Sequence, residues 1–154
     1  MCVAYHSDNL FVKYKNALFK YTIDGKLVKK LYKTSTGEDW RGLCAVSNDG
    51  STIHIADYVN DRLITVNSQG IFLASLEIES LLRPHVMPSG HVLVVCENGV
   101  EQISQDGKLT LGTLKQDGEA TEIIDVIYHH KKKCLLVATE DKIGKAVIFE
   151  MTIE

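Results

Sequence analysis

Short runs of apolar residues, separated by turn residues, follow one another along the whole chain of 154 residues. In the most regular stretch the runs lie at 43–46, 51–57, 62–67 and 71–76. Runs of this length that are rich in Val, Ile and Leu predict β-strands rather than helices. No segment combines a sustained helical period with capping residues, so we expect very little helix.

This unit of four strands recurs along the chain. The run at 53–57 has counterparts at 10–14, 93–97 and 136–140, which begin 43, 40 and 43 residues apart. A repeat near 40 residues with four short strands is typical of a β-propeller blade. We therefore predict a single all-β domain, a β-propeller-like array of three to four four-stranded antiparallel blades. The approximate blades are residues 1–36, 37–79, 80–115 and 116–154.

Glycine marks most turns between the predicted strands. A tight hairpin often needs a positive φ, which glycine adopts without a steric penalty. A phosphate-binding loop is a poorer interpretation, because no helix follows any of these glycines. The structural repeat positions that we identify are five such glycines and one strand-ending aspartate: Gly25, Gly50, Gly70, Gly90, Gly107 and Asp57. Pro84 and Pro88 are both expected in connections, because proline cannot donate a ladder hydrogen bond.

The predicted strands amount to three blades and most of a fourth. Closed propellers usually have four to eight blades, and an open arc leaves the two end sheets uncovered. Three arrangements remain open at this point. A longer parent chain completes the propeller, a second copy of the chain does so by self-association, or the chain closes as a four-bladed ring.

The second blade carries the most specific pattern in the chain. Its residues 40–66 resemble an NHL repeat, in which Gly-[Ile/Leu]-Ala-Val and a glycine turn precede a strand that ends in Ala-Asp, followed by Asn, a spacer and Arg. The matching residues, in order, are Gly42, Ala45, Val46, Gly50, Ala56, Asp57, Asn60 and Arg62. The third blade keeps Gly90 and Glu97 but lacks the Asn-x-Arg, and the first and fourth blades keep the strand pattern alone.

Propellers built from NHL repeats look like the C-terminal domains of TRIM-NHL (tripartite motif) proteins. There the propeller is the recognition end of a ubiquitin ligase or of an RNA-binding regulator. The resemblance implies a non-catalytic protein-binding module, with a protein as the favoured partner and RNA as the alternative. It does not imply ligase activity, because the paired Cys/His spacing of RING or B-box modules is absent from the sequence.

Loops expected at one face of the propeller contain the candidate partner-binding residues. Aromatic residues and arginines are typical of interface hot spots, and they also suit stacking on unpaired RNA bases. The candidates are Trp40, Arg41, Tyr58, Asn60, Arg62, Arg83 and His85. Two structural interpretations stand beside this one. Trp40 would lie wedged between blades, and Asp57, Asn60 and Arg62 would form a hydrogen-bonded group that holds their own loop.

The net charge and the small number of possible metal ligands make two classes of function less favoured, nucleic-acid binding and metal-dependent catalysis. The net charge of −3 disfavours a generally nucleic-acid-binding surface, and the lysine clusters at 26–33 and 131–133 are expected at a solvated rim. A metal-dependent hydrolase or lactonase-like propeller is a second alternative, but its candidate residues are few: Glu97, Asn98, Glu122 and Asp125. No catalytic triad spacing, Walker loop or HExxH motif occurs. We therefore expect no enzyme activity, no cofactor and no metal.

The four cysteines are far apart and form no CxxC pair. Three of them lie within apolar strands, which favours small buried side chains in a reducing compartment over disulfides or zinc ligands. No apolar run approaches 18 residues, and no N-terminal stretch has the pattern of a signal peptide. The expected location is therefore cytoplasmic, without a membrane partner.

Overall fold

A computed structural model describes residues 2–34, 42–97, 99–115, 122–140 and 143–152. These residues form fifteen strands in four antiparallel sheets, and the described part contains no helix that could cross a membrane. The chain is thus all-β, as the sequence predicted. Apolar runs rich in Val, Ile and Leu form the strands, and turn residues separate them.

Each sheet is built from strands that are consecutive in the chain, and neighbouring strands pair in chain order. Sheet 1 contains β1 (Cys2–His6), β2 (Asn9–Tyr14), β3 (Ala17–Thr22) and β4 (Leu27–Lys33). Sheet 2 contains β5 (Cys44–Val46), β6 (Thr52–Asp57), β7 (Arg62–Asn67) and β8 (Phe72–Glu77). Sheet 3 contains β9 (Leu81–Val86), β10 (Val92–Cys96), β11 (Gly99–Ile103) and β12 (Thr110–Lys115). Sheet 4 contains three strands, β13 (Glu122–His129), β14 (Cys134–Glu140) and β15 (Ala146–Thr152).

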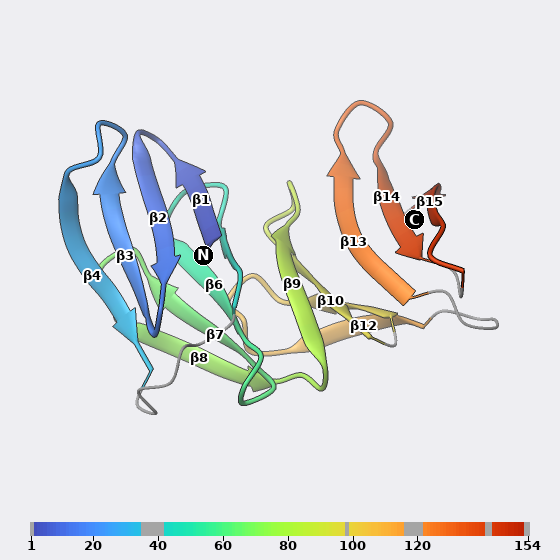
Figure 1. Cartoon of the computed structure of the whole chain (residues 1–154), viewed down its shortest axis with the longest axis horizontal. Coiled ribbons are helices and arrows are strands. Elements are labelled where there is room, and N and C mark those ends of the chain that lie inside the picture. The colour runs from blue at the N-terminus through green and yellow to red at the C-terminus, as the bar shows by residue number, and fades with distance from the viewer. Residues whose placement is uncertain (1, 35–41, 98, 116–121, 141–142, 153–154) are drawn as a thin grey trace.

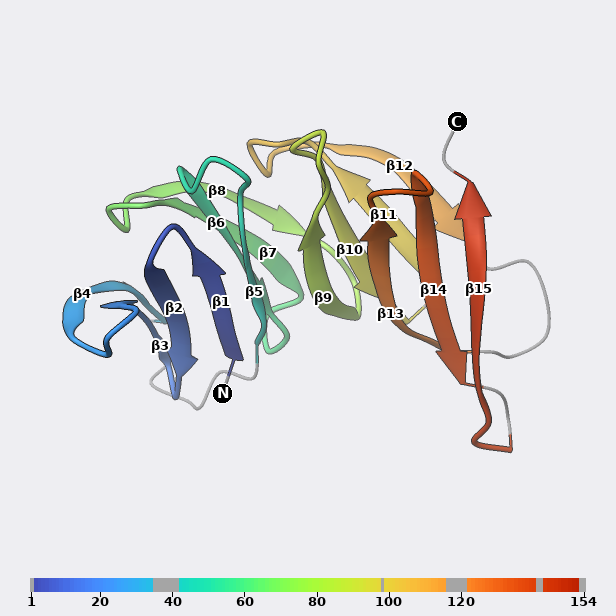
Figure 2. The same cartoon turned by 90° about the horizontal axis from the view of Figure 1, so that it is seen from above.

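The sheets follow one another in chain order along an arc, as in a propeller that does not close. Sheet 1 (blue) and sheet 4 (orange to red) lie at opposite ends of the molecule in both views (Figures 1 and 2). The first strands of consecutive sheets, β1, β5, β9 and β13, pack against one another. We call them the inner strands. The architecture is that of a partial β-propeller.

Three apolar clusters fill the spaces between consecutive sheets. Between sheets 1 and 2 the cluster includes the buried Leu18 and Ile55, and between sheets 2 and 3 it includes Leu63 and Val94. The third cluster lies between sheets 3 and 4 and includes Leu135. Sheets 2 and 3 are therefore covered on both faces, which explains why β6 and β10 are buried along almost their whole length.

Turns of one sheet pack directly on strands of the sheet before it. A Cβ atom added to Gly70 would lie 2.3 Å from the carbonyl oxygen of Leu31, and one added to Gly107 would lie 2.0 Å from Thr65 Oγ1. Gly25 occupies the same turn in sheet 1, and a Cβ atom there would meet nothing within 4 Å. The lack of space for a Cβ atom at Gly70 and Gly107 is therefore caused by the neighbouring sheet and not by the turn itself.

The hairpin between β5 and β6 joins three sheets. His6 Nε2 lies 2.9 Å from the Asn48 carbonyl oxygen, which links sheet 1 to sheet 2. The side-chain amide of Asn48 donates to the carbonyl oxygen of Met87 at 2.8 Å, which links sheet 2 to sheet 3. These hydrogen bonds add polar contacts to the apolar clusters.

The position of Pro84 differs from the prediction. Pro88 lies in a connection, but Pro84 lies within β9, where it is paired with Val94 of β10. Among the described strands, the inner strand of each sheet has a ladder partner on one side only, and that of β9 is β10. The missing N–H of Pro84 is tolerated at such an edge. Arg83 and His85 consequently lie on a strand and not on the loop that the sequence indicated.

Candidate partner-binding surface

The loop between β6 and β7, residues 58–61, is fixed by the neighbouring connection between β8 and β9. The backbone N–H of Ile78 donates to the Asp61 carbonyl oxygen at 2.8 Å, and that of Ser80 donates to Asp61 Oδ1 at 3.1 Å. We call the end of the sheets that carries residues 58–61 and 78–80 the Tyr58 face. Of the predicted site, Trp40 and Arg41 lie outside the described residues.

A buried carboxylate fixes the base of the 58–61 loop. Asp57 is fully buried, and its Oδ2 accepts hydrogen bonds from Asn60 Nδ2 at 2.8 Å and Arg62 Nε at 3.3 Å. A buried charge is costly unless it is paired and hydrogen-bonded, so these two donors stabilise the loop. The contacts that the sequence indicated among these three residues are present. Val59, at the loop tip, remains exposed.

Tyr58 connects this loop to sheet 3. Its half-buried hydroxyl donates to the carbonyl oxygen of Leu82 on β9. Burial raises the pKa of Tyr58, and the nearby positive charge of Arg83 opposes that shift. The Tyr58 side chain therefore bridges sheets 2 and 3 beside an arginine of the inner strand.

Arg83 and His85 connect β9 to sheet 4. Arg83 Nη1 forms an ion pair with Asp125 Oδ2 on β13, and His85 Nε2 accepts the backbone N–H of Tyr128 at 3.3 Å. Burial lowers the pKa of His85, and the carboxylate of Asp125 opposes that shift. The described candidate residues thus form two groups. Asn60 and Arg62 contact Asp57. Arg83 and His85 lie on β9, and Tyr58 contacts that strand.

Asp125, which the sequence offered as a lactonase-type ligand, is the ion-pair partner of Arg83. Glu97 is exposed, Asn98 lies outside the described residues, and the side chain of Glu122 is not among those described. Within the described ranges, no group of three or more His, Cys, Asp or Glu side chains is arranged to hold a metal ion.

Two cysteines that sequence reasoning treated as ordinary core residues lie side by side. Cys2 begins β1 and Cys44 begins β5, and their sulfur atoms are 3.9 Å apart. They are 42 residues apart in the chain and share no local motif. Their equivalent positions in consecutive repeats are the one signal in the sequence that could have paired them.

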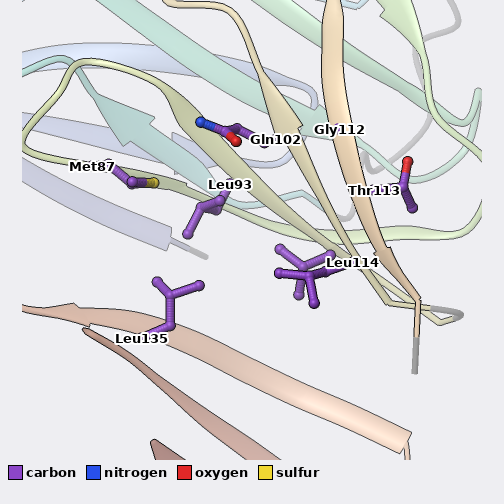
Figure 3. Close-up of a pocket in the computed structure, with 8 residues that line it drawn as sticks. Met87, Leu93, Gln102, Gly112, Thr113, Leu114 and Leu135 are labelled. Atoms are coloured by element: carbon purple, nitrogen blue, oxygen red, sulfur yellow. The ribbon is translucent and has the colours of Figure 1, made fainter. Parts of the chain in front are cut away.

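An apolar cavity of about 200 Å³ lies between sheets 3 and 4. Figure 3 shows Leu135 of sheet 4 across the cavity from Leu93 and Leu114 of sheet 3. Gln102 lines it as well, with its amide Nε2 3.1 Å from His91 Nδ1. Among the described residues that line it, none has a titratable side chain.

The chain was compared with protein families and with known proteins. No family model matches it, and no curated protein matches it by sequence.

Solved structures share the fold at low sequence identity. A Bacteroides caccae protein of unknown function superimposes with a TM-score of 0.72 at 12% identity, over 97% of this chain and 66% of that protein. Streptogramin B lyase gives a TM-score of 0.72 at 12% identity, over 96% of this chain and 53% of the lyase. The β-propeller domain of Cps50 (Swd1) from Myceliophteria thermophila gives 0.73 at 13% identity, over 99% of this chain and 55% of that structure. The chain therefore has a β-propeller fold and spans 53% to 66% of the length of these propellers.

Proposed function

We propose that this chain is a non-catalytic, cytoplasmic protein-binding module, similar in role to the partner-recognition propeller of TRIM-NHL proteins. Its binding surface is the Tyr58 face, with Trp40 and Arg41 of the preceding connection. The NHL-like pattern of residues 42–62 and the propeller fold support this assignment.

The observation that carries the proposal is the preformed loop 58–61. Asp57, Asn60 and Arg62 fix its base, and Asp61 fixes its far side through Ile78 and Ser80. Val59 projects from this fixed frame with 50% of its surface exposed. A rigid loop that presents an apolar side chain loses little conformational entropy on binding, which favours affinity.

The contacts of two polar side chains on β9 support the non-catalytic assignment. Arg83 is paired with Asp125, and the nitrogen of His85 accepts a backbone N–H. Their contacts hold sheets 3 and 4 together, which is a structural role.

The test compares two surface variants with wild type against a purified partner obtained by affinity capture. Val59→Asp places a charge at the exposed loop tip, and the double variant Trp40→Ala, Arg41→Ala changes the adjoining connection. Both are expected to weaken the measured affinity at least about tenfold, as for hot-spot residues. Circular dichroism confirms that the β-sheet content is unchanged.

Lys131→Ala provides the matched control, because Lys131 is exposed in the hairpin between β13 and β14 at the opposite end of the inner strands. It should leave the affinity unchanged. The proposed surface is wrong if Lys131→Ala weakens binding and neither Val59→Asp nor the double variant does.

RNA binding is the second candidate function, and the composition of sheet 1 favours it. Residues 1–36 contain seven lysines and two aspartates, and Lys26, Lys29, Lys30 and Lys33 are exposed. Binding of a fluorescent single-stranded RNA should then fall steeply with salt concentration, because phosphate contacts release counterions. Affinity for RNA that is independent of salt, or undetectable at low salt, rules this candidate out.

We further infer that blades from outside these 154 residues complete the propeller. Sheet 1 exposes Val3 and Tyr5, and sheet 4 exposes Ile127 and Ile148, all of them large apolar side chains on end sheets. The additional blades can come from a second copy of this chain or from a longer parent chain, and light scattering of the purified chain distinguishes the two. A dimer indicates a second copy, whereas a monomer whose end sheets become protected only within a longer chain indicates that parent chain.

A further inference from the structure

The two cysteines at the start of neighbouring inner strands are arranged as a pair. Besides the 3.9 Å between the sulfurs, the backbone N–H of Cys44 donates to Cys2 Sγ at 3.5 Å. Both residues lie at the interface that joins sheet 1 to sheet 2, where β1 packs against β5. A disulfide requires a sulfur–sulfur distance of about 2.05 Å, so the two sulfur atoms must approach each other by about 1.9 Å for the bond to form.

The pair is chemically asymmetric. The hydrogen bond from the Cys44 thiol, together with the Cys44 backbone N–H and the charge of Arg83, lowers the pKa of Cys2 to about 6, although burial opposes the shift. The same hydrogen bond and burial raise the pKa of Cys44. The backbone N–H that Cys2 Sγ accepts, together with the lower burial of Cys2, favours Cys2 over Cys44 as the thiolate of the pair. This is the arrangement of an attacking thiol beside a resolving thiol.

The other two cysteines lack these features. Cys96 and Cys134 are buried within β10 and β14. Burial raises the pKa of Cys96 to about 12, so that its thiol stays protonated and unreactive. The chain thus contains its own internal controls for thiol reactivity.

We propose that Cys2 and Cys44 are a reversible disulfide-forming site that reacts with a peroxide and covalently joins the inner strands β1 and β5. The Cys2 thiolate attacks one oxygen of hydrogen peroxide, so that an S–O bond forms, the O–O bond breaks and hydroxide leaves. The Cys44 sulfur then attacks the sulfenic sulfur of Cys2. The S–S bond forms, the S–O bond breaks, and water carries away the oxygen. Two thiols are oxidised, and one peroxide is reduced to two molecules of water.

The disulfide would change the interface between sheets 1 and 2. It would close a loop between residues 42 positions apart, and such a cross-link restricts the unfolded chain. It would also replace a pair of hydrogen-bonded thiols by a covalent bond at the inner strands. Sheet 1, which has a neighbouring sheet on one side only, would then be fixed to sheet 2.

The experiment treats the reduced full chain with equimolar hydrogen peroxide and follows it by intact mass and peptide mapping. The expected product is a monomer that has lost two hydrogen atoms and contains a Cys2–Cys44 peptide pair, and dithiothreitol should restore the thiols. The double variant Cys96→Ser, Cys134→Ser should give the same product. Cys44→Ser should stop at a Cys2 sulfenic acid that dimedone traps, and Cys2→Ser should not react.

Two further measurements use the wild-type chain alone, so that they do not depend on the folding of a variant. Brief alkylation with iodoacetamide should label Cys2 faster than Cys96 by on the order of tenfold or more, because the thiolate is the nucleophile. The oxidised chain should unfold at a higher urea concentration than the reduced chain. The proposal fails if peroxide converts Cys2 to a sulfinic acid without a cross-link, links two chains, or pairs any other cysteines.

Discussion

Sheets 2 and 3 differ sharply from sheets 1 and 4, although all four come from the same repeat. All five residues of β10 are buried, and in β6 all but the first are. In β2 and β14, which hold the same place in the end sheets, buried residues alternate with more exposed ones. The repeat therefore sets the strands, whereas the number of neighbouring sheets sets how deeply each strand is buried.

The largest expected difference concerns one isoleucine in each class of sheet. Ile64→Ala in β7 removes a side chain that is 1% exposed, and it should lower the free energy of unfolding by about 2 to 5 kcal/mol. Ile148→Ala in β15, where the side chain is 70% exposed, should change it by less than about 0.5 kcal/mol. Urea unfolding of both variants measures the contrast. Equal losses would mean that sheet 4 is covered in solution.

The second prediction uses a buried histidine of sheet 2. His54 is fully buried, with Nδ1 3.0 Å from Thr65 Oγ1, and burial lowers its pKa to about 4. The unfolded chain binds the proton near pH 6.5, so the folded state should lose stability as the pH falls from about 6.5 to about 4. The loss is on the order of 3 kcal/mol, since each pKa unit corresponds to about 1.4 kcal/mol.

Urea unfolding at several pH values measures this slope in wild type and in His54→Gln. The variant should show a smaller slope in that range. If His54→Gln keeps the full pH dependence of the unfolding free energy, a group other than His54 causes that dependence.

The third prediction separates a turn from its contact with the next sheet. Gly25 and Gly70 have nearly the same φ, 85° and 84°, so alanine should suffer a similar backbone strain of about 1 to 2 kcal/mol at either position. At Gly70 the new Cβ would also collide with the Leu31 backbone. Gly70→Ala should therefore destabilise the chain by about 1 to 3 kcal/mol more than Gly25→Ala, measured by urea unfolding. A difference near zero would indicate that sheets 1 and 2 separate readily.

The smallest expected effect is the loss of the hydrogen bonds of one side chain. Asn48→Ala removes the amide that donates to the Met87 carbonyl oxygen between sheets 2 and 3. The loss should be about 1 kcal/mol, because the freed groups lie at a hairpin where water can replace the amide. Ser89→Ala, in the facing turn, is the control and should have little effect on the midpoint of thermal unfolding.

The sequence predicted those features that depend on neighbouring residues. The strand repeat and the turns at Gly25, Gly70 and Gly107 are local patterns, and so is the group formed by Asp57, Asn60 and Arg62 within six residues of chain. The contacts between sheets were not predictable in this way. Arg83 meets Asp125 and Cys2 meets Cys44 across 42 residues each, and only the stacking of the sheets brings them together.

Pro84 shows why a composition rule alone was insufficient. Proline is excluded from strands with two ladder partners, but the inner strand of each sheet has one. The rule therefore depends on the position of the strand within the sheet, which is a property of the fold.

The contacts between consecutive sheets have a consequence for how the number of sheets in such a chain can change. The main contacts between strands of different sheets join consecutive sheets, as in β1 with β5, β6 with β9 and β10 with β13. In an array of this kind, gene duplication or deletion of a terminal repeat alters one junction and leaves the others intact. The number of sheets in the arc can therefore change, in evolution or by protein engineering, in steps of about forty residues.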